Sequence, residues 1–291
     1  MNSKRRDLWL APLRGVTIRA FRLVFADAIR KAGFRGGIAP FIPANAGFRY
    51  SRKLFADILP EVQPPGIELI PQVIGKDPMA LREWCKAVKD LGYGKADLNA
   101  GCPFPMIRKK GRGSGLIRSA DLLDKMLEAG CDEMGPGNFS LKTRLGIDSS
   151  DELYGLLPVV NRYPLSFLTI HARTAVQMYE GAPDREAFEA IKSLVKTPVM
   201  YNGDAEVSEP GSDPLMVGRS FICSLADLPD AKDLFMRYVE TSREELCGDA
   251  SVLGRMKELL SYWCKEPSWR GMWQSVKICR TIEELFMVLG I

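Results

Sequence analysis

The sequence holds a single histidine, His171, which follows the apolar run 167–170. One imidazole cannot supply a cluster of histidine metal ligands or serve several histidine-dependent steps. Three other apolar runs end in polar residues, and these polar stretches begin at Asn99, Lys142 and Asn202. If the runs are parallel strands, their carboxyl ends meet on one face of the fold. The four polar stretches therefore predict one active site without a metal.

Cys102 lies between Gly101 and Pro103, just after one of these runs, which predicts a stiff and exposed turn. A thiol held there could act as a thiolate nucleophile or, in its neutral form, as a proton donor. The second role needs no base, because a reference pKa of about 8.5 keeps a cysteine mostly protonated at neutral pH. The first would need His171 as the base, and the sequence leaves both roles open.

Two further features indicate an anionic or electron-rich ligand. Lys142 would be costly to bury alone, and the N1–C2 carbonyl region of a flavin is one partner that would compensate its charge. The stretch 217–220, Val-Gly-Arg-Ser, ends the last predicted strand, where barrels of this type bind phosphate. Five basic residues and no acidic one lie in 106–118, interleaved with glycines, which predicts a flexible basic loop.

Eight short apolar runs, separated by amphipathic segments, predict an α/β fold, a (β/α)8 TIM barrel. The runs are 8–11, 37–41, 68–73, 96–99, 139–142, 167–171, 198–202 and 214–218. Helices are predicted over 78–91, 119–133, 150–163 and 184–195. The residues at the strand ends, which should converge, are Gln72, Asn99, Cys102, Lys142, His171, Asn202 and Arg219.

The seventh unit of this barrel is short. Only nine residues, 205–213, separate Asp204 from Pro214, and they include Pro210 and Gly211. A parallel crossover usually takes a dozen or more residues. Either the seventh helix is lost or the eighth strand is wrongly assigned; we favour the first, and expect 205–213 to be a loop.

After Leu234 the strand pattern stops, and 235–245, 250–264 and 273–289 read as helices. We therefore expect a barrel domain over 1–234 and a small all-helical domain over 235–291. A unit of this size should pack on the barrel or on a ligand, because its own core would be small.

The composition is that of an ordinary globular protein, with 46% hydrophobic and 26% charged residues and a net charge of +4. No apolar stretch approaches the roughly 20 residues of a membrane helix, and the N-terminus leads directly into the first predicted strand. Seven cysteines without a C-x-x-C pair predict neither disulfides nor a zinc site. We expect a cytoplasmic monomer that binds no metal and no membrane.

The motifs, taken in chain order, resemble those of the tRNA-dihydrouridine synthases. The resemblance covers about residues 8–221 and extends more loosely into the tail. The matching segments are 10–17 (LAPLRGVT), 71–78 (PQVIGKDP), 97–103 (DLNAGCP), 113–117 (GSGLI), 142–146 (KTRLG), 171–174 (HART) with Gln177, Tyr179 and Gly181, 202–204 (NGD), 218–219 (GR), 255–257 (RMK) and 260–262 (LSY).

The resemblance implies reduction of the uracil C5–C6 double bond in tRNA by FMN, with NADPH as the electron donor. Hydride would pass from reduced FMN to C6, and Cys102 would protonate C5. The implied FMN contacts are Pro12, Leu13, Arg14, Gln72, Lys142, His171, Asn202, Gly203, Asp204, Gly218 and Arg219. The implied uridine and RNA contacts are Asn99, Arg173, Tyr179, Lys109, Lys110, Arg255, Lys257 and Lys277.

Some features depart from the family pattern. Leu13 stands where methionine is usual, which is a mild change. The interval from Asn202 to Gly218 is short, which weakens the expected wall behind the flavin phosphate. From Phe235 onward eight basic residues face eight acidic ones, so RNA binding by the tail depends on their distribution. Two alternatives stay open: a flavin barrel that reduces a small unsaturated molecule, and a homologue that binds RNA without catalysis. The sequence does not indicate which uridine is modified.

Overall fold

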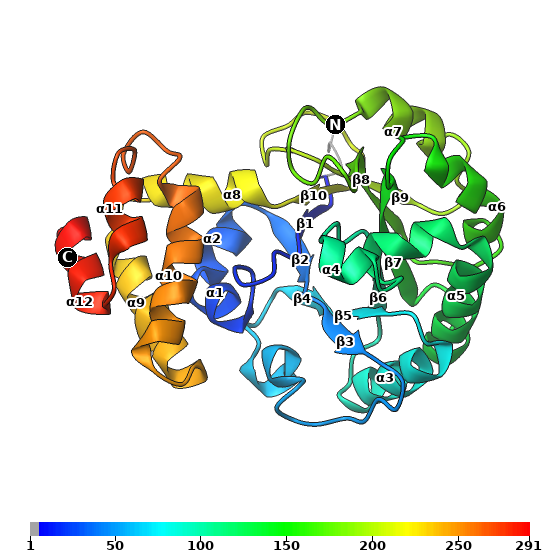
Figure 1. Ribbon diagram of the computed structural model, residues 1–291, viewed down its shortest axis with the longest axis horizontal. Coiled ribbons are helices and arrows are strands. Elements are labelled where there is room, and N and C mark those ends of the chain that lie inside the picture. Colours follow the sequence, from blue (N-terminus) through cyan, green and yellow to red (C-terminus); the bar gives the residue numbers. More distant parts are fainter. Residues whose placement is uncertain (1–5) are drawn as a thin grey trace.

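Ten short parallel strands form the centre of the molecule in the computed structural model, which describes residues 6–291 (Figure 1). They are β1 (Leu8–Leu10), β2 (Phe34–Ile38), β3 (Ile42–Ala44), β4 (Glu68–Ile70), β5 (Gln72–Gly75), β6 (Ala96–Ala100), β7 (Phe139–Gly146), β8 (Leu168–Thr174), β9 (Val199–Asn202) and β10 (Leu215–Val217).

The ten strands occupy the eight strand positions of a closed barrel. β2 and β3 together fill one position, and β4 and β5 fill another. Pro71, which has no N–H to donate between strands, separates β4 from β5. β2 pairs with β4 and β3 pairs with β5, while β1 pairs with both β2 and β10. The predicted TIM barrel is therefore confirmed. The predicted strand 37–41 was misplaced, because the observed β2 begins at Phe34 and ends at Ile38.

The barrel interior changes from apolar to polar along its axis. Its lower part is a separate cluster of buried side chains, Trp9, Ala11, Ile38, Ile70, Phe167, Met200 and Met216. Two residues further along three of these strands come Gln72, Asn202 and Gly218. Because side chains of a strand return to the same face every second residue, these positions also face inward. The polar layer thus lies at the carboxyl ends of the strands, where barrels of this kind carry their sites.

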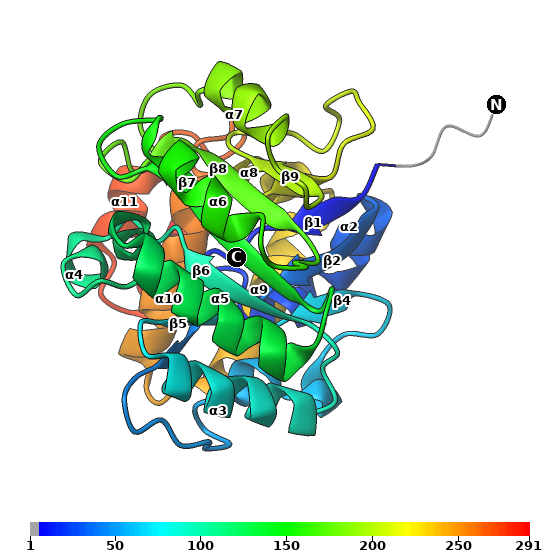
Figure 2. The ribbon, with the colours of Figure 1, turned by 90° about the vertical axis from the view of Figure 1, so that its right-hand side faces the viewer.

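Helices cover the outside of the sheet (Figures 1 and 2). They are α1 (Arg19–Val24), α2 (Ala26–Lys31), α3 (Pro78–Asp90), α5 (Ala120–Met134), α6 (Leu157–Val160), α7 (Arg185–Lys192) and α8 (Arg219–Ser224). The short helix α4 (Pro105–Arg108) instead lies over the carboxyl ends of the strands. The side chains of Asp77, Ser119 and Asp184 cap α3, α5 and α7 by accepting from backbone N–H groups. The predicted single helix over 150–163 is wrong: a 3-10 turn, Glu152–Leu156, precedes the four-residue α6.

The segment 205–213 forms no helix, which confirms the shortened seventh unit. Mostly polar contacts tie this loop to the barrel. Arg6 donates to the carbonyl of Glu209 over 2.8 Å, and the side chain of Glu209 pairs with Arg185 at 2.5 Å. Exposed ion pairs of this kind contribute about 0–1 kcal/mol each. The loop is therefore held less firmly than the helices around it.

We expect the backbone amides of 206–213 to exchange with solvent faster than those of α7, because local opening is easiest where backbone ladders and apolar contacts are few. Hydrogen exchange followed by mass spectrometry on the purified protein measures this. Peptides from α3 and α5 provide the internal reference for well-protected helices. Uniform protection around the barrel would contradict the expectation.

The chain ends in four helices, α9 (Ala231–Glu245), α10 (Asp249–Trp263), α11 (Trp273–Ile278) and α12 (Ile282–Leu289). The predicted single helix over 273–289 is wrong, because the helix is interrupted at residues 279–281. The Thr281 side chain caps the second helix, α12. α9 begins at Ala231, so the expected boundary at 234/235 falls within it. The ring of Tyr238 on α9 packs against Phe21 and Phe25 at centroid distances of 6.4 and 6.0 Å. The helical unit thus shares a core with the barrel beside α1 (Figure 1).

Within residues 6–291 no helix has both the length and the apolar character needed to cross a membrane. The same residues contain no group of three or more histidine, cysteine or acidic side chains arranged to hold a metal ion.

Candidate active site

One cavity of about 1130 Å³ opens at the carboxyl ends of the strands, and α10 of the helical unit forms part of its wall. The predicted site residues that line it are Pro12, Leu13, Arg14, Asn99, Cys102, Lys142, His171, Tyr179, Asn202, Gly203, Asp204, Gly218, Arg219 and Arg255. The predicted site residues outside the lining are Gln72, Lys109, Lys110, Arg173, Lys257 and Lys277. Residues on or after β1, β6, β7, β8, β9 and β10 therefore meet in one place, whereas Gln72 of β5 lies outside the lining.

The turn that carries Cys102 is held from both sides. The Asn99 side chain accepts hydrogen bonds from the N–H groups of Gly101 and Cys102 at 3.1 and 2.8 Å. The Cys102 carbonyl accepts from the N–H and hydroxyl of Ser114 at 3.1 and 2.9 Å. Gly113 (φ +56°) approaches so closely that an added Cβ would lie 2.8 Å from the Cys102 Cβ. A residue with a side chain could not occupy this position without moving the turn.

The expected exposure of the Cys102 turn is wrong, because the residue is only 7% exposed. Burial raises the pKa of the Cys102 thiol, and this outweighs a hydrogen bond from the Phe104 backbone and the positive charges of Arg144 and other groups. The thiol is therefore neutral at physiological pH. Of the two roles that the sequence left open, this environment favours the proton donor over the thiolate nucleophile.

Lys142 is a buried cation at the inner wall of the cavity. Its Nζ donates to Asn202 Oδ1 at 2.9 Å, which uses one of its three donors. Burial, together with the charge of Arg144, lowers the pKa of Lys142 to about 7, although the carboxylate of Asp97 acts in the opposite direction. The remaining donors suit an electron-rich ligand in the cavity, which would also restore the charge of the ammonium group.

His171 is buried among cationic groups. Burial is the largest cause that holds the pKa of His171 well below its usual range, and the positive charges of Arg144 and Lys142 act in the same direction. The ring lies 6.1 Å from that of Tyr179. A neutral imidazole can donate one hydrogen bond and accept another. His171 is thus suited to bind a polar ligand in the cavity.

Asp204 joins two arginines at the rim of the cavity. Its carboxylate pairs with Arg173 through one oxygen and with Arg219 through the other. Burial alone would raise the pKa of Asp204, but the hydrogen bond from Arg173 and the charge of Arg219 hold it below its usual value. Arg173 is 1% exposed and also donates to the Gly181 carbonyl at 2.6 Å. The side chain expected to contact substrate is therefore used within the protein.

Arg144 is a site residue that the sequence analysis missed. It is buried, and it donates to the carbonyls of Gly101 and Thr174 at 2.9 and 2.8 Å. Its guanidinium lies 5.3 Å from the ring centre of Tyr179, whose ring also lies 5.2 Å from the guanidinium of Arg219. Arg144 follows Lys142 by two residues on β7, so strand alternation was the signal that placed it on the same face.

A second missed group lies on α10. The cavity lining includes Glu258 and Tyr262 in addition to the expected Arg255, and Lys265 from the turn after α10. The intervals of three and four residues place Arg255, Glu258 and Tyr262 on one face of the helix. Helical periodicity could have found them, but only with the knowledge that this face of α10 covers the barrel mouth.

The basic segment 106–118 is not a flexible loop. It forms α4 and a 3-10 turn, Gly113–Arg118, whose residues 113–117 are buried. The backbone N–H of Ser114 donates a hydrogen bond to the carbonyl of Cys102, and this bond holds the segment against the active-site turn. Lys109 and Lys110 remain exposed to solvent beyond α4. The expected basic charge is therefore displayed on an ordered support.

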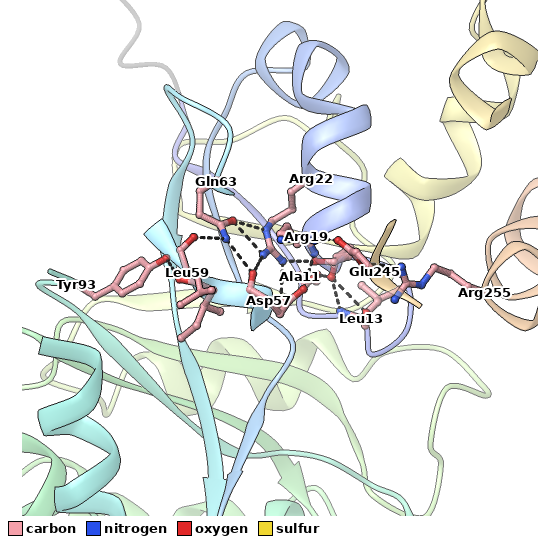
Figure 3. A network of polar contacts seen from close by, with 12 residues as sticks. Ala11, Leu13, Arg19, Arg22, Asp57, Leu59, Gln63, Tyr93, Glu245 and Arg255 are labelled. Atoms are coloured by element: carbon pink, nitrogen blue, oxygen red, sulfur yellow. Dashed lines mark hydrogen bonds and ion pairs between the residues drawn. The ribbon is translucent and has the colours of Figure 1, made fainter. Parts of the chain in front are cut away.

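Two of the three predicted cations of the tail, Arg255 and Lys257, already have partners within the protein. Arg255 contacts Glu245 at 2.6 Å, and the other oxygen of Glu245 contacts Arg19 of α1 at 2.7 Å (Figure 3). Lys257 Nζ donates to the carbonyls of Lys277 and Cys279 at 2.8 and 2.5 Å. Arg255 therefore connects the helical unit to the barrel at the edge of the cavity, and Lys257 connects α10 to the end of α11.

The network in Figure 3 continues into the barrel. Arg22, only 1% exposed, contacts the carboxylate of Asp57 at 3.2 Å and the side-chain oxygen of Gln63 at 3.1 Å. The backbone N–H of Arg19 donates to the same Asp57 carboxylate at 2.5 Å. Helix α1 is therefore fixed between the segment 57–63 and α9 of the helical unit. The cavity-lining residues Arg14 and Ile18 lie just before this anchored helix.

Comparison with known proteins gives the family. Residues 9–220 match the family described as dihydrouridine synthase. The tRNA-dihydrouridine synthase B of Vibrio cholerae is 28% identical over 224 residues, which cover 74% of this chain and 67% of that protein. A probable tRNA-dihydrouridine synthase of Staphylococcus epidermidis is 31% identical over 227 residues, which cover 72% of this chain and 67% of that protein. The tRNA-dihydrouridine(16) synthase of Shigella flexneri is 27% identical over 245 residues, covering 74% and 76%.

Solved structures of similar fold include a morphinone reductase variant in complex with tetrahydroNAD. It has a TM-score of 0.54 and 11% identity over 75% of this chain and 84% of that one. The old yellow enzyme of Trypanosoma cruzi has a TM-score of 0.51 and 11% identity over 78% and 88%. At such identity the likeness concerns the fold alone, and the sequence match to the family carries the assignment. The chain belongs to the dihydrouridine synthase family.

Proposed function

We propose that this protein reduces uridine to 5,6-dihydrouridine in tRNA, with FMN as its cofactor and NADPH as the electron donor. The observation that carries the proposal is the placement of a buried neutral thiol, Cys102, and a buried cation, Lys142, on the wall of one cavity at the barrel mouth. A thiol there can give a proton, and a cation there can hold an electron-rich ring. The names of the family relatives supply the substrate class.

The residues present fit FMN. Two donors of Lys142 Nζ are left for an isoalloxazine carbonyl, and neutral His171 offers a further hydrogen-bonding group. The glycines of the lining, Gly203 and Gly218, carry N–H groups that make no hydrogen bond among the described residues, and Arg219 lies beside them. Backbone N–H groups next to an arginine suit a phosphate. Pro12, Leu13 and Arg14 would complete the ring site from the loop after β1.

Gln72 would act from behind the cavity wall. It is fully buried, and its amide is bonded to Asp97 and Asn99. One N–H of that amide is left for the flavin ring. Asp204 would act on the phosphate through Arg219, which it holds in place, because a carboxylate in direct contact with a phosphate would be repelled.

When bound, reduced FMN would supply hydride to C6 of the uracil ring. Cys102 would donate its proton to C5, which becomes electron rich as the double bond is reduced. Asn99 and Tyr179, which line the same cavity as the thiol, would hold the base, and the guanidinium of Arg144 packs against the Tyr179 ring. General acid catalysis by a positioned side chain contributes a factor of roughly 10²–10⁴.

The uridine must leave the tRNA fold to reach this cavity. We propose that the barrel carries the chemistry, and that the helical unit, from α9 onward, orients the RNA. Lys109 and Lys110 on the rim would contact phosphates directly. In the tail, Arg255, Lys257 and Lys277 would contact the RNA, although the first two already contact Glu245 and the carbonyls at the end of α11.

The direct test uses the purified protein, FMN, NADPH and a tRNA that lacks dihydrouridine. The expected result is a yellow protein that forms dihydrouridine, detected by mass spectrometry of the digested tRNA. Flavin reduction by NADPH without any dihydrouridine, but with turnover of a small enone, would support the small-molecule alternative instead. A homologue that binds RNA without catalysis is not favoured, because both Cys102 and Lys142 are present in the cavity.

RNA binding should depend on salt. Each phosphate neutralised by a lysine releases counterions, so affinity falls linearly with salt on a logarithmic plot, and removing one contact flattens the slope by roughly one. Lys109→Ala and Lys110→Ala should each have this effect. Lys31→Ala is the control, because Lys31 ends α2 just before β2 begins, at the opposite end of the barrel. A tRNA affinity that ignored salt between about 50 and 200 mM would contradict the proposal.

A further inference from the structure

Below the active-site turn lies a layer of buried polar side chains that takes no part in the cavity wall. Gln72, Asp97 and Ser140 are register partners on the neighbouring strands β5, β6 and β7. All three are 0% exposed. Asn99 follows Asp97 by two residues on β6 and therefore faces the same side of the sheet. The layer thus connects the barrel interior to the turn that carries Cys102.

Hydrogen bonds in this layer run in one direction. Asp97 accepts from Gln72 Nε2 at 2.7 Å and from the Ser140 hydroxyl at 2.6 Å. Burial raises the pKa of Asp97 only to about 6, since these bonds and the charge of Lys142 oppose it. Both of its oxygens meet a donor, and a carboxylate in this place can only accept. Gln72 must therefore turn its NH₂ group toward Asp97 and its oxygen toward Asn99.

The direction passes on to the catalytic turn. Asn99 Nδ2 donates to Gln72 Oε1 at 2.9 Å, which leaves Asn99 Oδ1 to accept from the N–H groups of Gly101 and Cys102. If the Gln72 amide were reversed, NH₂ would face NH₂, and Asn99 would have to turn its own NH₂ group toward these backbone N–H groups. The acceptor-only carboxylate at one end thus determines the cap at the other.

We propose that Asp97 is a positioning residue for proton transfer: through Gln72 and Asn99 it holds the backbone of Cys102, and so places the thiol that protonates the substrate. This inference rests on the proposed function of Cys102. Asp97 does not line the cavity, so it acts through the other residues and not by contact with the substrate. A displacement of about 1 Å at a reacting group can cost on the order of 100-fold in rate.

Three variants separate this role from a general structural one. Asp97→Ala removes the acceptor and releases the Gln72 amide. Asp97→Asn keeps an oxygen for Gln72, because the Ser140 hydroxyl can rotate to accept from the new NH₂ group. Ser140→Ala removes the other hydrogen bond to Asp97 in the same buried layer but leaves the direction of the Gln72 and Asn99 amides unchanged. Thermal unfolding of each variant confirms that it is folded.

In the FMN-loaded enzyme, Asp97→Ala should lower kcat for dihydrouridine formation at least about tenfold, with KM for tRNA changed less than about threefold. Because proton transfer then limits the rate, the solvent deuterium isotope effect on kcat should rise. Asp97→Asn and Ser140→Ala should keep kcat near that of the parent protein. In parallel, hydrogen exchange at the amides of Gly101 and Cys102 should speed up in Asp97→Ala alone, whether or not the protein is active.

The exchange measurement separates failure of this inference from failure of the proposed function. An inactive parent protein whose 101–102 amides lose protection in Asp97→Ala would overturn the role of Cys102 and retain the hydrogen-bonded connection. Equal losses of kcat in Asp97→Ala and Ser140→Ala, or an unchanged isotope effect, would overturn the positioning role of Asp97. If Asp97→Ala does not fold, Asp97→Leu removes the same acceptor while it fills the buried space, and it carries the same expectations.

Discussion

Replacing Cys102 by alanine is expected to slow dihydrouridine formation by roughly 10²–10⁴, the usual contribution of a general acid, while flavin reduction by NADPH proceeds at the parent rate. The thiol is buried and neutral, so it can give a proton to C5, but it has no part in the transfer of electrons to the flavin. Stopped-flow absorbance follows flavin reduction, and mass spectrometry follows the modified tRNA. Loss of both activities together would indicate a structural cysteine.

Two further measurements sharpen this expectation. Cys131→Ala removes another buried thiol, on the outer helix α5, and should leave both activities near those of the parent protein. The pH profile distinguishes acid from nucleophile. Because burial raises the pKa of the Cys102 thiol above its ordinary value of about 8.5, product formation should not increase between about pH 7 and 9. A rate that rose with the thiolate fraction would contradict the proton-donor role.

The barrel could be predicted because its physical signal repeats along the chain. Each strand of the barrel is a short apolar run, and parallel strands bring the carboxyl ends of these runs together whatever their distance in the sequence. The exceptions are local. Pro71 divides the predicted strand 68–73 into β4 and β5, and Gly155 and Pro158 interrupt the predicted helix 150–163. These breaks depend on backbone chemistry at single residues, which a pattern averaged over a segment does not resolve.

The site could be predicted only in part, because pairing between distant residues is not encoded in spacing. Arg173 and Lys257 look like free cations in the sequence, but Asp204 and the carbonyls at the end of α11 occupy them. The face of α10 that lines the cavity is decided by how the helical unit docks, through Tyr238 against α1. Contacts of this kind follow from the assembled fold and not from any one motif.

Lys142→Met is expected to weaken FMN binding on the order of 100-fold and at the same time to stabilise the flavin-free protein. The ammonium group is buried with one hydrogen bond, to Asn202, and burial lowers its pKa to about 7. Keeping that cation without a ligand costs on the order of 3–5 kcal/mol at pH 7, from the difference between about 7 and the unfolded value of about 10.5. Part of this gain in stability is offset in Lys142→Met, because the Asp97 carboxylate loses its positively charged neighbour.

The pH dependence gives the sign of this effect. Between about pH 7 and 10 the unfolded chain keeps the proton of Lys142 while the folded chain has lost it, so the free energy of unfolding rises with pH. The advantage of Lys142→Met in flavin-free protein should therefore be largest near neutral pH and shrink as the pH approaches about 10. Urea unfolding at both ends of this pH range measures the difference in stability, and Lys125→Met, at an exposed lysine on α5, is the control.

A Lys142→Met variant that is less stable than its parent at neutral pH would mean that the cation already has a sufficient partner inside the protein. Unchanged flavin affinity would remove Lys142 from the cofactor site.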